Sequence, residues 1–292
     1  MIEALSTLCG HLVEAGVLPP AFVHLFMARA LIAAVVVGGV FGLLSPLVQA
    51  RRLAFFSAAL GQSAMVGVAV GVFLGEPIEA PWAGLFGVTT LSALWLVFAR
   101  RRLGLSADTL VGVFLAISLA VGLTALVLVT RRFNIHQVEA VLFGSPLTVS
   151  DHDLGILLLV SVVVVAVVAV STRPLLLDAL DPGLAAAARL RTGWWEYVFV
   201  AVLACAVVVA LRVVGALLVE ALVVIPAATA RLLSSSWRRV TALSVVLGVV
   251  GGVAGLLVSA ASLVPAGAAI VLCLGAAFVV AGLWSVLRGG RR

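Results

Sequence analysis

The sequence has few charged residues, and lysine is absent altogether. Only 10% of its 292 residues are charged, whereas about a quarter are charged in ordinary soluble domains, and 64% are hydrophobic. All 18 basic residues are arginines, and most lie at the ends of apolar runs, where they mark the cytoplasmic side of a membrane protein. The composition therefore predicts an integral membrane protein. The net charge of +6 indicates membrane topology and no nucleic-acid partner.

Cysteine is scarce as well. Cys9, Cys205 and Cys273 form no C-x-x-C pair, and the last two lie within apolar runs. This pattern favours small buried side chains over a disulfide framework or a thiolate metal site. Cys9, His11 and Glu14 are an alternative metal-binding set, but their spacing matches no standard site.

Several motifs are missing. The sequence has no Walker A phosphate loop, no glycine-rich dinucleotide fingerprint and no fixed-period repeat. We therefore expect no bound nucleotide, and an energy source outside this chain. The first basic residue is Arg29, so a cleavable signal peptide with a positively charged start is not expected.

Apolar runs fill most of the chain. At about 1.5 Å per residue, a run of about 20 residues crosses a hydrocarbon core of about 30 Å. Nine such runs predict an all-α, polytopic membrane protein, with spans at about 22–49, 55–74, 81–99, 108–129, 154–170, 197–213, 214–231, 240–262 and 266–287. Residues 1–25 precede this transmembrane domain of residues 26–292 and predict an interfacial helix that ends at Pro19 and Pro20.

The distribution of arginines among the loops predicts which way the nine spans are oriented in the membrane. With the amino end outside, the outer loops hold only Arg131 and Arg132, and the cytoplasmic loops and carboxyl end hold most of the others. The cytoplasmic side then includes the polar stretch 171–196. Within it, Asp181 is placed to cap a helix that starts at Pro182, which predicts a short helix at about 180–190.

Two predicted spans contain residues that a plain lipid anchor does not need. Glu220 is a charge within an apolar run, which is costly and marks a functional candidate, although an ion pair with Arg212 is an equal alternative. Pro226 should kink or break the same span, either to shape a cavity or for packing. Gln62 and Ser63 are polar residues that could face a pathway, in a span whose recurring small residues also suit helix packing.

One of these spans also carries a family pattern. Residues 214–231 read Val-Gly-Ala-Leu-Leu-Val-Glu-Ala-Leu-Val-Val-Ile-Pro-Ala-Ala-Thr-Ala-Arg, which resembles the signature segment of bacterial ABC importer permeases for zinc, manganese and iron. Shorter pieces agree in order and spacing, at residues 51–56, 142–144, 180–185 and 265–272. The resemblance extends from about residue 27 to the end of the chain.

This resemblance implies a type II importer permease that acts as a homodimer in the bacterial cytoplasmic (inner) membrane. It implies a transport subunit with no enzymatic activity and no cofactor of its own. Its partners would be ABC ATPase subunits below, an extracellular or periplasmic substrate-binding protein above, a second copy and membrane lipid. The residues implied to couple to the ATPase are Asp181, Pro182, Gly183 and Leu184. Transport by alternating access would use a substrate pathway with Gln62, Ser63, Glu220 and Pro226.

One departure from the family puts the cargo in question. Family members have a Gly-Asp-x-x-x-His-Ala pattern, and the matching positions here are Ser57, Ala58, Gln62 and Ser63. Alanine cannot bind a metal, and an amide is a weaker ligand than imidazole. Either a free metal ion uses other ligands such as Glu220, or the cargo is a chelate or a porphyrin-like compound.

Two other kinds of function remain as rivals. An ion-coupled secondary carrier would use Glu220 as its proton site. A membrane-embedded enzyme would need carboxylates or histidines clustered at one membrane face, and the acidic residues are too scattered for that.

Overall fold

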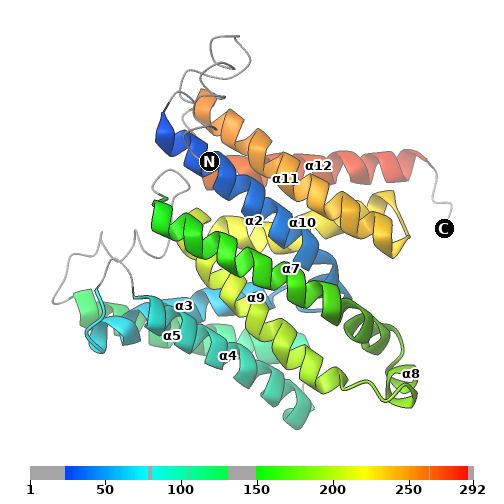
Figure 1. The fold of residues 1–292 in the computed structure, drawn as a ribbon, viewed down its shortest axis with the longest axis horizontal. Helices are drawn as coiled ribbons and strands as arrows, with labels where there is room; N and C mark the ends of the chain where they lie inside the picture. Colours follow the sequence, from blue (N-terminus) through cyan, green and yellow to red (C-terminus); the bar gives the residue numbers. More distant parts are fainter. Residues whose placement is uncertain (1–23, 78–80, 105, 131–148, 263, 289–292) are drawn as a thin grey trace. The chain divides into compact units, whose positions relative to one another are not determined.

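The computed structural model describes residues 24–77, 81–104, 106–130, 149–262 and 264–288, and these residues form helices and short connections (Figure 1). The predicted amino-terminal helix and the motif at residues 142–144 lie outside them. The helices are α2 (Leu25–Ala50), α3 (Phe56–Phe73), α4 (Trp82–Leu103), α5 (Ala107–Thr130), α7 (Asp151–Leu180), α8 (Pro182–Ala187), α9 (Thr192–Val214), α10 (Ala216–Leu233), α11 (Trp237–Ser262) and α12 (Ala266–Leu287).

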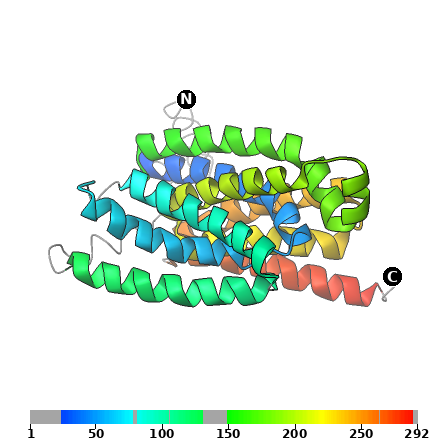
Figure 2. The ribbon, with the colours of Figure 1, turned by 90° about the horizontal axis from the view of Figure 1, so that it is seen from below.

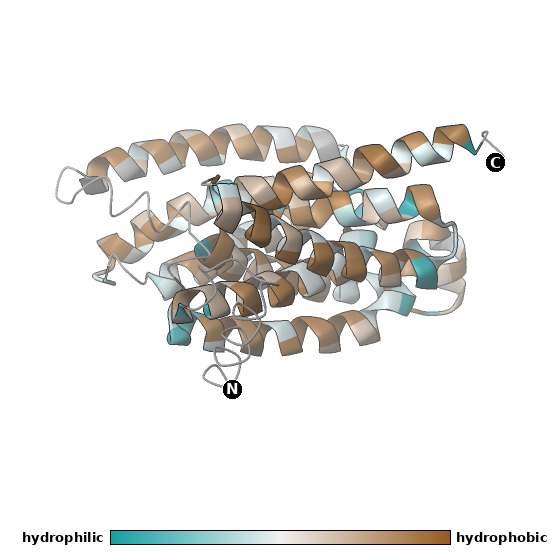
Figure 3. Cartoon of the chain, turned by 90° about the horizontal axis from the view of Figure 1, so that it is seen from above, coloured by the Kyte–Doolittle hydropathy of each residue, from teal (hydrophilic) through white to brown (hydrophobic). Residues whose placement is uncertain are grey.

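The described helices have the length and surface of membrane spans. Seven of them are long and apolar enough to cross a bilayer, and α5 and α10 occupy the two other predicted positions. Apolar colour runs along the helices in Figure 3, and the polar patches gather near their ends. Leu91, Val162 and Leu283 lie within helices and are 61–69% exposed, as lipid-facing side chains are. The predicted polytopic all-helical class is confirmed.

The chain divides into two compact units. The first contains Met1–Pro46, Gly144–Leu159 and Val213–Arg292, and the second contains Leu47–Phe143 and Val160–Arg212. In the first unit, α10, α11 and α12 pack on one another, and α2 packs on α11. A Cβ at Gly38 would lie 2.4 Å from the Gly248 carbonyl oxygen, so the backbones of α2 and α11 touch.

The second unit is built around α3, which packs against both α4 and α5 (Figure 2). A Cβ at Gly67 would lie 2.8 Å from the carbonyl oxygen of Gly84 in α4. Some of the small residues of α3 therefore serve close helix packing, which is the alternative that the sequence left open for this span.

The predicted end of the fifth span is wrong. The sequence indicates a span that ends near residue 170 and then a polar connection, but α7 continues through Pro174 to Leu180. Proline removes only one helical donor, and Leu175 just after it is completely buried. Asp178 then pairs with Arg51, so the polar part of the helix is held by packing and by charge.

Candidate functional site

The short helix α8 forms as the sequence predicts. Asp181 Oδ1 accepts a hydrogen bond of 3.0 Å from the backbone N–H of Leu184, and Pro182 is the first helical residue. Asp181, Gly183 and Leu184 are exposed, with Leu184 at 57%. A capped helix with an exposed apolar side chain is a suitable surface for a partner protein.

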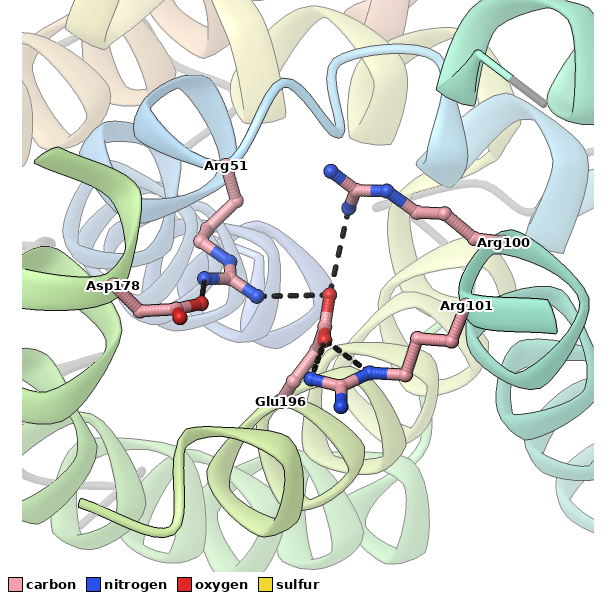
Figure 4. A network of polar contacts seen from close by, with 5 residues as sticks. All are labelled: Arg51, Arg100, Arg101, Asp178 and Glu196. Carbon is pink, nitrogen blue, oxygen red and sulfur yellow. Dashed lines mark hydrogen bonds and ion pairs between the residues drawn. The ribbon is translucent and has the colours of Figure 1, made fainter. Parts of the chain in front are cut away.

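A cluster of charged side chains occupies the same unit, at the ends of the helices on either side of α8 (Figure 4). Glu196, near the start of α9, forms an ion pair with Arg51 Nη2 at 2.8 Å and accepts a hydrogen bond from Arg101 Nε at 2.8 Å. Arg100 Nη1 lies 3.4 Å from the same carboxylate. Asp178 at the end of α7 pairs with the other Nη of Arg51. The cluster joins the ends of α2, α4, α7 and α9.

Local structure brings these arginines together. Arg51 lies in the turn after α2, which closes with a hydrogen bond of 2.9 Å from Leu53 N–H to the Val48 carbonyl. This turn places Arg52 at φ 56°, the left-handed region that glycine usually occupies. Arg100 and Arg101 lie in the last turn of α4, where the helix dipole favours positive charge.

Sequence reasoning missed this cluster because it assigned the arginines to membrane topology alone. Glu196 and Asp178 were not selected as site residues. The available signal was that these two acidic residues fall on the side of the protein that the arginines mark. A single sequence does not show which arginine meets which carboxylate, because the cluster joins residues up to 145 positions apart.

The two polar residues of α3 have different surroundings. The Ser63 hydroxyl is buried and donates to the Leu60 carbonyl at 2.8 Å, so it is already used within the helix. Gln62 Oε1 is buried and has no hydrogen-bond partner among the described residues. Ala58 lies one turn before Gln62 on the same helix face. Gln62 is therefore the residue on this face with an acceptor still available.

In the span with the family pattern, the helix is interrupted at Gly215 and continues through Pro226. Gly215, with φ 87° and ψ 161°, is the single residue between α9 and α10, a conformation that essentially only glycine adopts. Pro226 lies inside α10 without breaking it, and the neighbouring Ala227 N–H donates to Ser45 Oγ at 3.2 Å. The break that the sequence allows at Pro226 is not observed, since Ser45 from α2 supplies a partner next to the proline.

The structure assigns the predicted pathway residues to the two units. Gln62 and Ser63 belong to the unit of α3, and Glu220 and Pro226 belong to the unit of α10. Glu220 is on the exposed surface of its helix. Among the described residues, no group of three or more His, Cys, Asp and Glu side chains is arranged to hold a metal ion.

The helical arrangement is that of the membrane component of a type II ABC importer. It superimposes with a TM-score of 0.75 on a chain of PsaBC from Streptococcus pneumoniae in complex with Fab, at 27% identity over 88% of this chain and 90% of that one. The model of the ABC 3 transport family matches residues 23–285, so the chain belongs to this family.

Curated relatives match over nearly the same length. The manganese transport system membrane protein MntC of Listeria monocytogenes is 28% identical over 90% of this chain and 92% of its own length. The high-affinity zinc uptake system membrane protein ZnuB of Haemophilus influenzae is 26% identical over 79% of this chain and 86% of its own. The chain is thus a multi-pass permease subunit of a bacterial ABC transport system, and it is not a catalytic subunit.

Proposed function

We propose that this permease imports a divalent transition metal such as manganese or zinc, driven by ATP hydrolysis in separate subunits. The observation that supports the proposal is the family match over residues 23–285, together with relatives of nearly full length that are named for manganese and zinc transport. Two copies would form the pathway, and a substrate-binding protein would deliver the cargo from outside.

In this proposal the capped helix α8 transmits the movement of the ATPase. Its exposed start, with Asp181, Gly183 and Leu184, docks into the ATPase subunit. Substitution of Asp181 by alanine removes the hydrogen bond that the Asp181 side chain accepts from the Leu184 N–H. Such a cap stabilises a helix by about 1 kcal/mol.

The role of α8 is tested with Asp181→Ala in the reconstituted complex. We expect a several-fold loss of transport-coupled ATPase activity, while thermal unfolding of the isolated permease changes little. Asp153→Ala is a matched control, since Asp153 accepts hydrogen bonds from the Ser150 N–H and hydroxyl at the start of another helix, α7. Unchanged coupling in Asp181→Ala would contradict the docking role.

The substrate pathway is proposed to use Gln62, Ser63, Glu220 and Pro226. Gln62 supplies an amide oxygen that no described residue engages, and Glu220 supplies the one negative charge of these four residues. Oxygen ligands of this kind suit Mn²⁺ better than softer metals. Pro226 leaves a backbone carbonyl without its helical donor, which can contact a hydrated cargo.

A second candidate cargo is a metal chelate. It is favoured by the side chains of α3, where Ala58 and Gln62 stand in place of the family's carboxylate and imidazole, so a free ion would find few ligands there. A chelated metal arrives with its ligands already bound and needs only contacts with the chelator.

Uptake into proteoliposomes that contain the permease, its ATPase and its binding protein separates these cargoes. The free-ion proposal predicts ATP-dependent entry of radioactive Mn²⁺ or Zn²⁺, and Glu220→Gln should reduce it at least several-fold. Entry of the metal only together with a chelator would support the second candidate. Uptake that follows a proton gradient without ATP would contradict both and would indicate a secondary carrier.

A further inference from the structure

The charge cluster has more positive than negative groups, and the excess faces a cavity. The cavity has a volume of about 470 Å³, and its lining includes four arginines, Arg51, Arg52, Arg100 and Arg101. Only two carboxylates, Asp178 and Glu196, share that lining. Two positive charges in the cavity therefore have no negative counterpart among its lining residues, which makes it a site for an anion.

Hydrogen-bond donors also outnumber acceptors around the cavity. A guanidinium has five N–H groups, and a carboxylate accepts about four hydrogen bonds. The Arg51 side chain is 7% exposed and uses both Nη atoms on Glu196 and Asp178, but its buried Nε has no acceptor among the described residues. This Nε atom has no exposed surface, so Arg51 contributes its positive charge to the cavity while its Nη atoms hold the two carboxylates.

Two of the four arginines are available for a ligand. The contact between Arg100 and Glu196 is long, at 3.4 Å, and the Arg100 side chain is 32% exposed. Arg52 is exposed and is held in the left-handed conformation by the turn after α2. Arginine binds phosphate especially well because its planar N–H groups match two phosphate oxygens at once.

Exposed apolar side chains close in sequence to the lining residues indicate which kind of phosphate compound the cavity binds. Three large ones are 66–82% exposed and lie one to three positions along the chain from residues that line the cavity: Phe55, Leu180 and Trp194. Aromatic side chains together with arginines are typical of the membrane interface, where lipid headgroups lie. Basic pockets among membrane helices are known sites for anionic lipid headgroups.

We propose that this cavity binds the phosphate headgroup of an anionic phospholipid. Arg52 and Arg100 donate to the phosphate oxygens, Arg51 adds its positive charge, and the exposed apolar side chains contact the acyl chains. The bound lipid would hold the ends of α2, α4, α7 and α9 together beside α8. This proposal depends on the membrane location of the chain and not on the identity of its cargo.

The test uses the permease of residues 1–292, stripped of lipid in a mild detergent. Phosphatidylglycerol should raise the midpoint of thermal unfolding and stay bound in native mass spectrometry, whereas phosphatidylcholine should do neither. Arg52→Gln and Arg100→Gln should each weaken phosphatidylglycerol binding about tenfold, the effect of losing one charge-assisted hydrogen bond. Arg102→Gln is the matched control, because this neighbouring arginine lies over the Phe98 ring and does not line the cavity.

Four results would overturn the proposal. Equal binding of the two lipids would show that the charge of the headgroup is not recognised. An equal loss in Arg102→Gln would show only general attraction to the arginines. Equal stabilisation by the same concentration of inorganic phosphate would indicate a site for a small anion. Loss of the ATPase from Arg100→Gln during copurification, with unchanged phosphatidylglycerol binding, would make the cavity a docking surface for that subunit. None of these measurements requires transport, so the lipid site and the proposed function can fail separately.

Discussion

Glu196 is a buried carboxylate that is surrounded by arginines. Its side chain is 5% exposed and contacts three arginines from two other helix ends. A buried charge is stable only when its partners are present, so the loss of one member of the cluster destabilises the others. The three guanidinium groups repel one another, and Glu196 keeps them together.

We expect Glu196→Gln to destabilise the permease by about 3 kcal/mol, because it leaves buried positive charge without its counterpart. Thermal or denaturant unfolding in detergent measures this loss. Asp151→Asn is the matched control, since Asp151 forms one ion pair with Arg29 at 2.8 Å and its side chain is 63% exposed. The control should cost less than about 1 kcal/mol. An equal effect of the two substitutions would show that burial of the cluster contributes nothing.

The residues of α3 allow a gain-of-function experiment. Ala58 and Gln62 lie one helical turn apart, so Ala58→Asp combined with Gln62→His places a carboxylate and an imidazole on one face. We expect the double variant to bind Zn²⁺ or Mn²⁺ at least tenfold more tightly than the natural chain, measured by equilibrium dialysis of the purified protein. Either substitution alone should have a smaller effect, and no gain in the pair would mean that this face does not meet the cargo.

At the scale of elements, the sequence predicts what depends on neighbours along the chain. The start of α8 follows from Asp181 and Pro182 alone, because a cap and a first-turn proline act within four residues. The nine long helices among the described residues follow from apolar runs, and the family pattern marks α10. The extent of α7 could not be predicted in the same way, since its polar end is held by Leu175 packing and by Arg51, which is 127 positions from Asp178.

The same reasoning explains what was missed in the candidate site. Gln62, Glu220 and Pro226 stand out because each is unusual in its own apolar run. The charge cluster consists of residues that are ordinary where they stand in the sequence, and only folding makes them a site. The role of Ser45, which is completely buried beside Pro226, could not be predicted either, because it comes from a different helix.

The junction between α9 and α10 depends on one glycine. Gly215 has a backbone conformation that costs other residues about 1–3 kcal/mol, so Gly215→Ala should destabilise the chain by that amount. Gly275→Ala is the control, since it lies inside α12, has no positive φ, and a Cβ there would meet no atom within 4 Å. That substitution should be neutral or slightly stabilising. Unfolding midpoints of the two variants compare the effects directly.

At the scale of the whole molecule, the orientation in the membrane determines whether the proposed parts can work together. Helix α8 and the charge cluster must lie on the cytoplasmic side if α8 is to meet an ATPase. The arginines of the sequence predict this side, and α11 offers a test because it begins at Trp237 beside Arg238 and Arg239 and ends at Ser262. Its 26 residues span about 39 Å at 1.5 Å per residue, which is long enough for its two ends to lie on opposite sides of a bilayer.

Single cysteines at the two ends of α11 test the predicted orientation. Ser235 and Ser262 are exposed, and serine and cysteine have nearly the same size, so Ser235→Cys and Ser262→Cys should fold normally in a chain whose native cysteines are replaced by alanine. In intact cells or right-side-out vesicles, a membrane-impermeant thiol reagent should label Ser262→Cys and leave Ser235→Cys unlabelled until the membrane is opened. The reverse pattern would place α8 outside, where no ATPase could reach it, and would contradict the coupling role together with the orientation. Labelling of both positions in intact vesicles would show that α11 does not cross the membrane.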